Sequence, residues 1–213
     1  MRRKLAFMLV IIGIAILFIG CTKPAVLQTD YERTKTIGQE LTKQTNQFEK
    51  KKKKLGEQIT YAIAQVNEDK SKSAREKLFK EWEKAVKEYK ELKKDYEKIG
   101  EKKEKYFKQL SKLTDQIKDK ELREKNKLRN NKLNEKFTMQ YTKTGQVLRE
   151  IKTVIQRGSD LTTSVKISHV IGVINTNINK LVDIRKEAKK LLQKLRKLRV
   201  KGDKILKTNA SKL

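Results

Sequence analysis

The sequence is poor in the residues that turn-rich or covalently linked folds require. Its 213 residues include one Cys, one Pro, one His and nine Gly. A single Cys excludes a disulfide-held scaffold, and one Cys with one His excludes most metal sites, which need several such ligands. Nine Gly and one Pro are too few for the many turns of a β-sandwich. Acidic residues are also scarce, since 26 Asp and Glu accompany 54 Lys and Arg, which gives a formal net charge of +28.

The residues that are abundant are typical of long helices. Charged residues make up 38% of the chain and apolar residues 36%, with only 6% aromatic. This mixture characterises coiled coils and long helical bundles. We therefore predict an all-α fold, an elongated antiparallel helical bundle or coiled coil of about four long helices. The length allows one large domain or two small ones.

The first twenty residues have the pattern of a secretory signal peptide. Three basic residues, Arg2 to Lys4, precede an uncharged apolar run from Leu5 to Ile19. As a helix this run would be about 22 Å long, shorter than the roughly 30 Å hydrocarbon core of a bilayer. A cleavable signal peptide over residues 1–20 therefore fits better than a membrane span.

The apolar run ends in Phe18-Ile19-Gly20-Cys21, which resembles the lipobox of bacterial lipoproteins although Phe18 replaces the usual Leu. The resemblance implies a diacylglyceryl thioether on Cys21, cleavage before that residue, and acylation of the new amino terminus by a chain such as palmitate. Each buried CH₂ of such an anchor contributes about 0.8 kcal/mol. The alternative is an uncleaved N-terminal anchor with an incidental Cys21. Either anchor places the chain in the cell envelope facing away from the cytoplasm, and Thr22 in place of Asp favours the periplasmic side of an outer membrane over an inner membrane.

Beyond this anchor we predict a tether, a helical domain and a tail. Residues 21–30 contain Pro24 and no helical period, so they are predicted to form the tether. Residues 31–207 carry apolar side chains at three- and four-residue steps, as amphipathic helices do. Residues 208–213 are polar, and we expect them to be disordered.

The clearest helical signal lies between Leu78 and Ile117. Apolar residues recur there at alternating steps of four and three, and Lys103 is the one charged residue on this stripe. A period of 3.5 residues predicts a left-handed supercoil against a partner helix. Short connections between the helical segments predict antiparallel neighbours in an up-down bundle, with one extended helical hairpin that dimerises as the alternative.

Local signals predict where the helices begin and end. Ser73 with Glu76 has capping-box spacing and predicts the start of the second helix, and Asp119 is suited to cap the third. Gly158-Ser159-Asp160 predicts a stop and a restart. Residues 161–172 stay ambiguous, because their β-branched side chains weaken a helix.

Three segments resemble domain of unknown function 2959, an uncharacterised family of bacterial lipoproteins. They are Leu78-Phe79-Lys80-Glu81-Trp82, Lys118-Asp119-Lys120-Glu121-Leu122-Arg123, and the stretch from Val147 through Ile155 to Leu181. The likeness covers most of residues 45–195, including the order of the segments. It implies a helical envelope lipoprotein and transfers no catalytic or binding residues. Members of that family are generally acidic or mixed in charge, so the likeness does not account for the positive charge of this chain.

Residues suited to catalysis or metal binding form no recognisable constellation. His169 is a candidate general base, but a lone His without partners is more typical of a polar residue at a helix start. Cys21 as a nucleophile competes with its own acylation. Asp and Glu are interleaved with Lys at the spacing of a solvated helix face. We therefore predict no enzymatic activity, no cofactor and no metal.

Two basic segments are candidate contacts for a polyanion. Residues 50–54 are five consecutive lysines, and residues 185–207 hold eleven Lys or Arg against two acids. In the envelope the partner would be anionic lipid or an envelope polymer, and each basic residue near an anionic surface contributes roughly 1 kcal/mol. The alternative is an AT-rich genome that fills solvated helix faces with Lys, and the excess of Lys over Arg agrees with it. The candidate contacts are Lys50, Lys51, Lys52, Lys53, Lys54, Arg196, Lys197, Arg199 and Lys201.

These observations predict two classes of function. The first is an envelope lipoprotein with a structural, adaptor or interaction role, whose partners are the membrane, through Cys21, and another protein or a second copy of itself. The second is a basic module that binds anionic lipid, envelope polysaccharide or nucleic acid. The export signal disfavours nucleic acid as the partner.

Overall fold

The computed structural model describes the backbone of residues 24–68, 71–171 and 178–210. Cys21 and the predicted export signal lie outside the described residues. The side chains described are those of residues 29–65, 71–168, 170–171 and 179–198.

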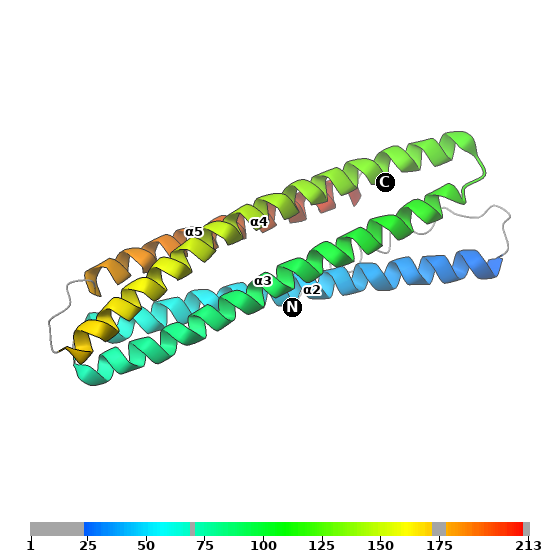
Figure 1. The fold of residues 1–213 in the computed structure, drawn as a ribbon. Helices are drawn as coiled ribbons and strands as arrows, with labels where there is room; N and C mark the ends of the chain where they lie inside the picture. Colours follow the sequence, from blue (N-terminus) through cyan, green and yellow to red (C-terminus); the bar gives the residue numbers. More distant parts are fainter. Residues whose placement is uncertain (1–23, 69–70, 172–177, 211–213) are drawn as a thin grey trace, which may run out of the picture. The chain divides into compact units, whose positions relative to one another are not determined.

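The described residues form four α-helices and no strand (Figure 1). The all-α fold predicted from the sequence is confirmed. No helix within the described ranges combines the length and the apolar character needed to cross a membrane. The helices are α2 (Pro24–Glu68), α3 (Lys72–Asp115), α4 (Lys120–Val170) and α5 (Ile178–Ala210).

The helical region begins earlier and ends later than the sequence analysis predicted. The tether predicted for residues 21–30 is wrong from Pro24 onward, because α2 begins at that residue. Proline suits the first turn of a helix, where its missing N–H would have no partner and its φ is already helical. At the other end α5 continues to Ala210, so the disordered tail predicted for residues 208–213 is wrong for residues 208–210.

Helix α4 runs without interruption through the stop predicted at Gly158-Ser159-Asp160. A Cβ atom at position 158 would lie 2.0 Å from Cζ2 of Trp82, so the glycine makes room for the indole ring of α3. Ser159 Oγ accepts a hydrogen bond from Trp82 Nε1 at 3.0 Å. The glycine therefore marks a close contact between helices and not a helix end. The ambiguous residues 161–172 are helical as far as Val170.

The starts of α3 and α4 are set by side-chain caps. Ser71 Oγ accepts the backbone N–H of Ala74 at 3.1 Å, so Ser71 caps α3 in place of the predicted Ser73. Asp119 caps α4 as predicted, because its Oδ1 accepts the N–H of Leu122 at 2.7 Å. Each cap gives a partner to a backbone donor that has none within the helix.

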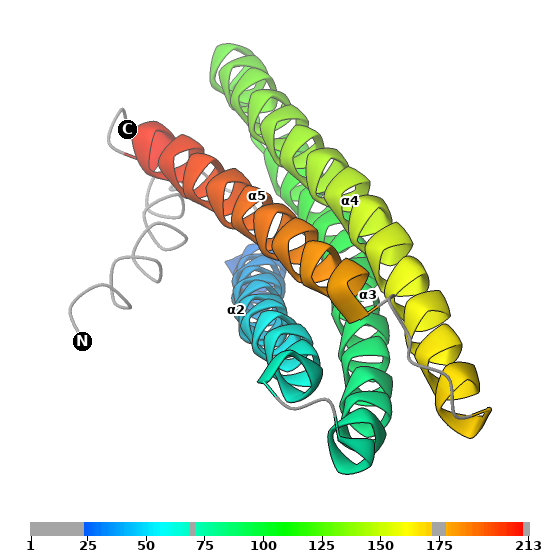
Figure 2. The ribbon, with the colours of Figure 1, turned by 90° about the vertical axis from the view of Figure 1, so that its left-hand side faces the viewer.

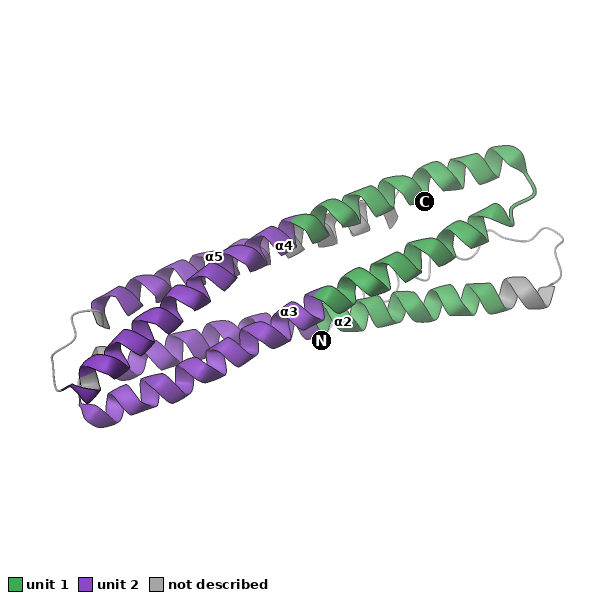
Figure 3. Cartoon of the chain, viewed as in Figure 1, with its two compact units in different colours: residues 1–46, 97–142, 198–213 green, residues 47–96, 143–197 purple. Residues whose placement is uncertain are grey.

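The helices contribute to two compact units (Figure 3). Unit 1 comprises residues 1–46, 97–142 and 198–213, and unit 2 comprises residues 47–96 and 143–197. Each of the four helices contributes residues to both units. The two units differ in what they bury, and each is described in turn.

Unit 2 is a bundle of antiparallel helices with an apolar core (Figure 1, Figure 2). Contacts between α3 and α4 show that these two helices run antiparallel. Trp82 of α3 contacts Ser159 of α4, whereas Tyr89, further along α3, contacts Leu148, which comes earlier in α4. Full burial of a Leu, Ile or Val side chain contributes roughly 1.5–3 kcal/mol. The largest fully buried side chains, all in unit 2, are Leu55, Ile59, Ile63, Leu78, Leu92, Ile151, Leu181, Val147, Val154 and Val165.

Unit 1 buries polar and apolar side chains in equal number among its described residues. Its segments of α2, α3 and α4 are also antiparallel, since Gln109 of α3 contacts Asp30 of α2 and Lys103 of α3 contacts Thr138 of α4. Its buried apolar residues are Leu41, Ile99, Leu110 and Ile117, and its buried polar residues are Thr34, Lys103, Gln109 and Thr114.

Candidate functional site

Lys103, the charged residue on the predicted apolar stripe, is buried in unit 1 with an exposed fraction of 6%. Its Nζ donates a hydrogen bond to Thr138 Oγ1 of α4 at 3.0 Å and lies 2.7 Å from Glu104 Oε1. A buried ammonium without such partners would be strongly destabilising. The stripe therefore tolerates this charge because one hydroxyl and one carboxylate compensate it.

A hydrogen-bond network crosses the interior of unit 1. The carboxylate of Asp30 accepts hydrogen bonds from Gln109 Nε2 and from Gln116 Nε2, each at 2.8 Å. Thr114 Oγ1 accepts a hydrogen bond from Asn130 Nδ2 of α4, also at 2.8 Å. These contacts join α2 to α3 and α3 to α4, so polar groups here hold helices together.

Arg129 and Tyr106 are partly buried in unit 1 and have perturbed pKa values. Burial raises the pKa of the Tyr106 hydroxyl, and the nearby Arg129 opposes this change only in part. Burial also lowers the pKa of the Arg129 guanidinium. Tyr106 therefore remains neutral throughout the physiological pH range.

The predicted polyanion contacts at residues 50–54 lie in unit 2, and four of the five lysines have an acidic partner. Lys52 is buried, Lys51 is half-buried, and the other three are exposed. No acid among the described residues pairs with Lys50. The ion pairs are Lys51 with Glu91 at 3.2 Å and with Asp95 at 3.1 Å, Lys52 with Glu49, Lys53 with Glu57 at 3.5 Å, and Lys54 with Glu88 at 2.6 Å.

Lys51 is the one of these lysines that pairs with two carboxylates of α3. Burial lowers the pKa of Lys51, but its hydrogen bonds to Asp95 and Glu91 outweigh that effect and raise the pKa above its ordinary value. Asp95 is only 2% exposed. Removing the lysine would leave this buried carboxylate uncompensated. Lys51 therefore joins α2 to α3, and the five lysines do not form one free cationic surface.

The second predicted basic segment lies on α5. Arg196 and Lys197 are exposed in unit 2. Arg199 and Lys201 belong to α5, but their side chains are outside the described set. Arg185, Lys189 and Lys190 lie on the same helix. They belong to the basic segment 185–207 recognised in the sequence, but the candidate contacts chosen there did not include them.

The structure adds little about the candidate catalytic groups. His169 lies within α4, and its side chain, like the whole of Cys21, is outside what the structure describes. Among the side chains that are described, no three from His, Cys, Asp and Glu gather as ligands of a metal ion would.

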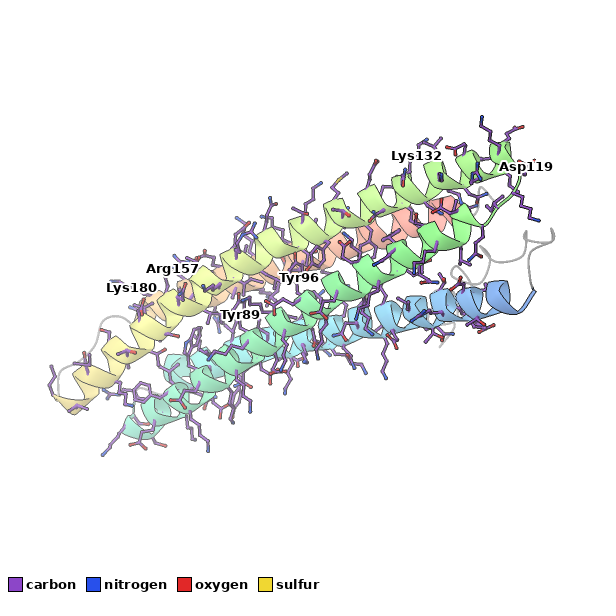
Figure 4. All side chains as sticks on the ribbon, turned by 45° about the vertical axis from the view of Figure 1, so that its right-hand side comes forward. Tyr89, Tyr96, Asp119, Lys132, Arg157 and Lys180 are labelled. Atoms are coloured by element: carbon purple, nitrogen blue, oxygen red, sulfur yellow. The ribbon has the colours of Figure 1, made fainter. Side chains whose placement is uncertain are left out.

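Sequence reasoning also missed contacts in which an aromatic ring lies against a glycine of the facing helix. In unit 1 a Cβ at Gly100 would lie 2.3 Å from Tyr141 Oη, and in unit 2 a Cβ at Gly145 would lie 2.4 Å from Tyr96 Oη. Tyr96 and Tyr89 extend from α3 (Figure 4). An isolated glycine within a helical pattern was the signal, because such a residue usually has a packing reason.

Comparisons with protein-family models, with curated proteins and with solved structures give no match to this chain. The fold itself defines the class: an all-α protein of long, packed helices. The resemblance to domain of unknown function 2959 stays a prediction.

Proposed function

We propose that this chain is a bacterial envelope lipoprotein with a structural, adaptor or interaction role and no catalytic activity. The observation that carries the proposal is the lipobox-like sequence from Phe18 to Cys21, which precedes a chain of packed amphipathic helices. The acyl chains on Cys21 would hold one end of the protein at a membrane and leave the helices available for contacts with partners.

Polar side chains within unit 2 make contacts between its own helices. Tyr89 Oη donates a hydrogen bond to the backbone oxygen of Leu148 at 3.2 Å, and Gln58 Nε2 donates to Glu81 Oε2 at 2.8 Å. The indole of Trp82 is likewise bonded to α4. These groups, which could bind a substrate in another setting, here hold neighbouring helices together.

Metabolic labelling with an alkyne fatty acid tests the anchor. We expect the wild-type chain to take up the label and to sediment with membranes, and we expect the matched control Thr22→Ser to do the same. Cys21→Ser should lose the label because the chain has no other Cys. Equal labelling of Cys21→Ser and the wild type would contradict the proposal.

A second candidate function is a basic module that binds a polyanion, whether anionic lipid, envelope polysaccharide or nucleic acid. The exposed basic residues of α5 favour it. Binding of the chain to anionic vesicles should weaken steeply between low and physiological salt, because surface charges are screened. Equal binding to neutral vesicles would contradict this function.

A further inference from the structure

The outward side of α5 in unit 2 carries a dense row of positive charge. Between Arg185 and Lys197 seven of the thirteen residues are Lys or Arg, and Glu187 is the one acid. At 1.5 Å per residue these positions extend over about 20 Å of helix. The core-facing side of the same segment is apolar and consists of the buried residues Ile184, Ala188, Leu191 and Leu195.

Ion pairs remove only a small part of this charge. Glu187 pairs with Arg157 of α4, so it does not neutralise a base on α5. Figure 4 labels Arg157. Lys194 pairs with Glu150 of α4 at 3.0 Å, and Lys186 pairs with Asp183 at 3.6 Å. Five bases of the row have no acid partner among the described residues; we call them the α5 basic face, and they are Arg185, Lys189, Lys190, Arg196 and Lys197.

The lysines of residues 50–54 provide a contrast within the same unit. Four of those five have a carboxylate within ion-pair distance, and the charge there serves contacts within the protein. The α5 basic face has no such partners among the described side chains, and four of its five residues are exposed, Arg185 being half-buried. Its positive charge is therefore available to a partner outside unit 2.

We propose that the α5 basic face binds the anionic surface of a lipid bilayer. None of the large apolar side chains that are exposed in the described residues lies on α5, so the contact is electrostatic and does not insert into the hydrocarbon core. A row of charges on a convex helix suits a flat array of head groups, and each basic residue near such a surface contributes to binding. The choice of a bilayer over other polyanions rests on the proposed function, which places the chain at a membrane.

The test compares two quadruple variants in the full chain carrying Cys21→Ser, so that no acyl anchor contributes. The first variant removes four charges from the α5 basic face. The control removes four charges from exposed positions of α3 in the same unit. The substitutions are Lys189→Gln, Lys190→Gln, Arg196→Gln and Lys197→Gln in the first, and Lys80→Gln, Lys87→Gln, Lys90→Gln and Lys94→Gln in the control.

Binding is measured at low salt by co-sedimentation with phosphatidylcholine vesicles that contain phosphatidylglycerol. We expect the α5 variant to bind roughly 100-fold more weakly than its parent and the α3 control to lose less than about threefold, since only the first removes charges that contact the surface. The apolar residues 1–20 are the same in the parent and in both variants, so the variants differ only in the charges removed. Circular dichroism confirms that both variants are folded.

Two outcomes would overturn the proposal. Equal losses of vesicle binding in the two variants would show that binding depends on the net charge of the protein and not on the α5 basic face. Unchanged vesicle binding by the α5 variant, with a loss of binding to duplex DNA or to heparin, would assign the face to another polyanion. Because all the chains in this test lack Cys21, its result is independent of the labelling experiment, and each can fail without the other.

Discussion

At the scale of single residues, contacts between α3 and α4 depend on glycine as much as on the aromatic rings. Trp82 of unit 2 is 2% exposed, and its ring occupies the space that a side chain at position 158 would need. The indole N–H is also bonded to Ser159, so the ring has little freedom to move aside. The position of the Trp82 ring therefore depends on the absence of a side chain at Gly158.

Gly158→Ala should reduce the free energy of unfolding by about 1–2 kcal/mol, because overpacking outweighs the gain in helix propensity. Gly56→Ala is the matched control, since its Cβ would meet the flexible end of Leu192 at 3.0 Å. We expect the control to be neutral or slightly more stable. Urea denaturation measures both, and equal stability of the two variants would contradict the contact.

Single ion pairs also give the stability a dependence on pH. Hydrogen bonds from Lys84 and from Gln58 lower the pKa of Glu81 below its ordinary value. The folded state favours the ionised form of Glu81, so this carboxylate stabilises the fold. Its contribution to stability is complete above the ordinary carboxyl pKa and is lost as the pH falls through the lowered pKa of the folded state. We expect Glu81→Gln to have a smaller loss of melting temperature on acidification than the wild type. An unchanged pH profile would contradict the assignment.

At the scale of elements, a helix begins where a side chain can accept its first backbone donors. Ser71 does this for α3 and Asp119 does it for α4. Sequence spacing identified Asp119 correctly but favoured Ser73 over Ser71, because Ser73 has Glu76 at the right distance. Both serines precede the same apolar stripe, so the spacing to the stripe could not distinguish them.

Ser71→Ala should destabilise the protein by about 1 kcal/mol, the usual effect of losing a helix cap. Ser73→Ala is the matched control and should have almost no effect or a slight stabilising one, because position 73 is within α3 and exposed. Thermal unfolding followed by circular dichroism compares the two. A larger loss for Ser73→Ala would show that α3 begins two residues later.

At the scale of the whole molecule, the described residues form two units with different interiors. Among the side chains that the structure describes, four buried apolar residues belong to unit 1 and twenty-two to unit 2, whereas buried polar residues number four and three. Apolar burial is the main source of stability, and hydrogen bonds between buried polar groups add little in comparison. The described part of unit 1 therefore has less apolar stabilisation than the described part of unit 2.

Hydrogen exchange should reveal this difference within single helices. We expect amides of residues 97–113 of α3 and 125–142 of α4 to exchange at least tenfold faster than those of residues 78–96 and 147–165, because regions with few buried apolar contacts open more readily. Native-state exchange followed by mass spectrometry measures the two sets together. Equal protection would show that polar contacts stabilise unit 1 as well as an apolar core stabilises unit 2.

Much of the fold could be predicted from the sequence because helical periodicity is a local property. The stripe from Leu78 to Ile117 identified buried positions of α3, including Lys103. The candidate binding residues were harder to predict from the sequence than the fold. Lys54 and Lys197 are both basic residues in a dense run. Lys54 pairs with Glu88 of the neighbouring helix α3, whereas Lys197 has no acid partner among the described residues, and this difference depends on how the helices pack.

The sequence by itself determined the class of fold, the faces that the helices bury and the resemblance of Phe18–Cys21 to a lipobox, because each depends on residues close together in the chain. Tertiary structure decided that Gly158 lies inside a helix and that Lys51 pairs with the buried carboxylate of Asp95. It also decided that the α5 basic face has no acid partner within the part of the chain that the structure describes. The physical reason is that Trp82 and Asp95, the partners in the first two contacts, reach their positions only when α3 packs in a defined register against α4 and α2.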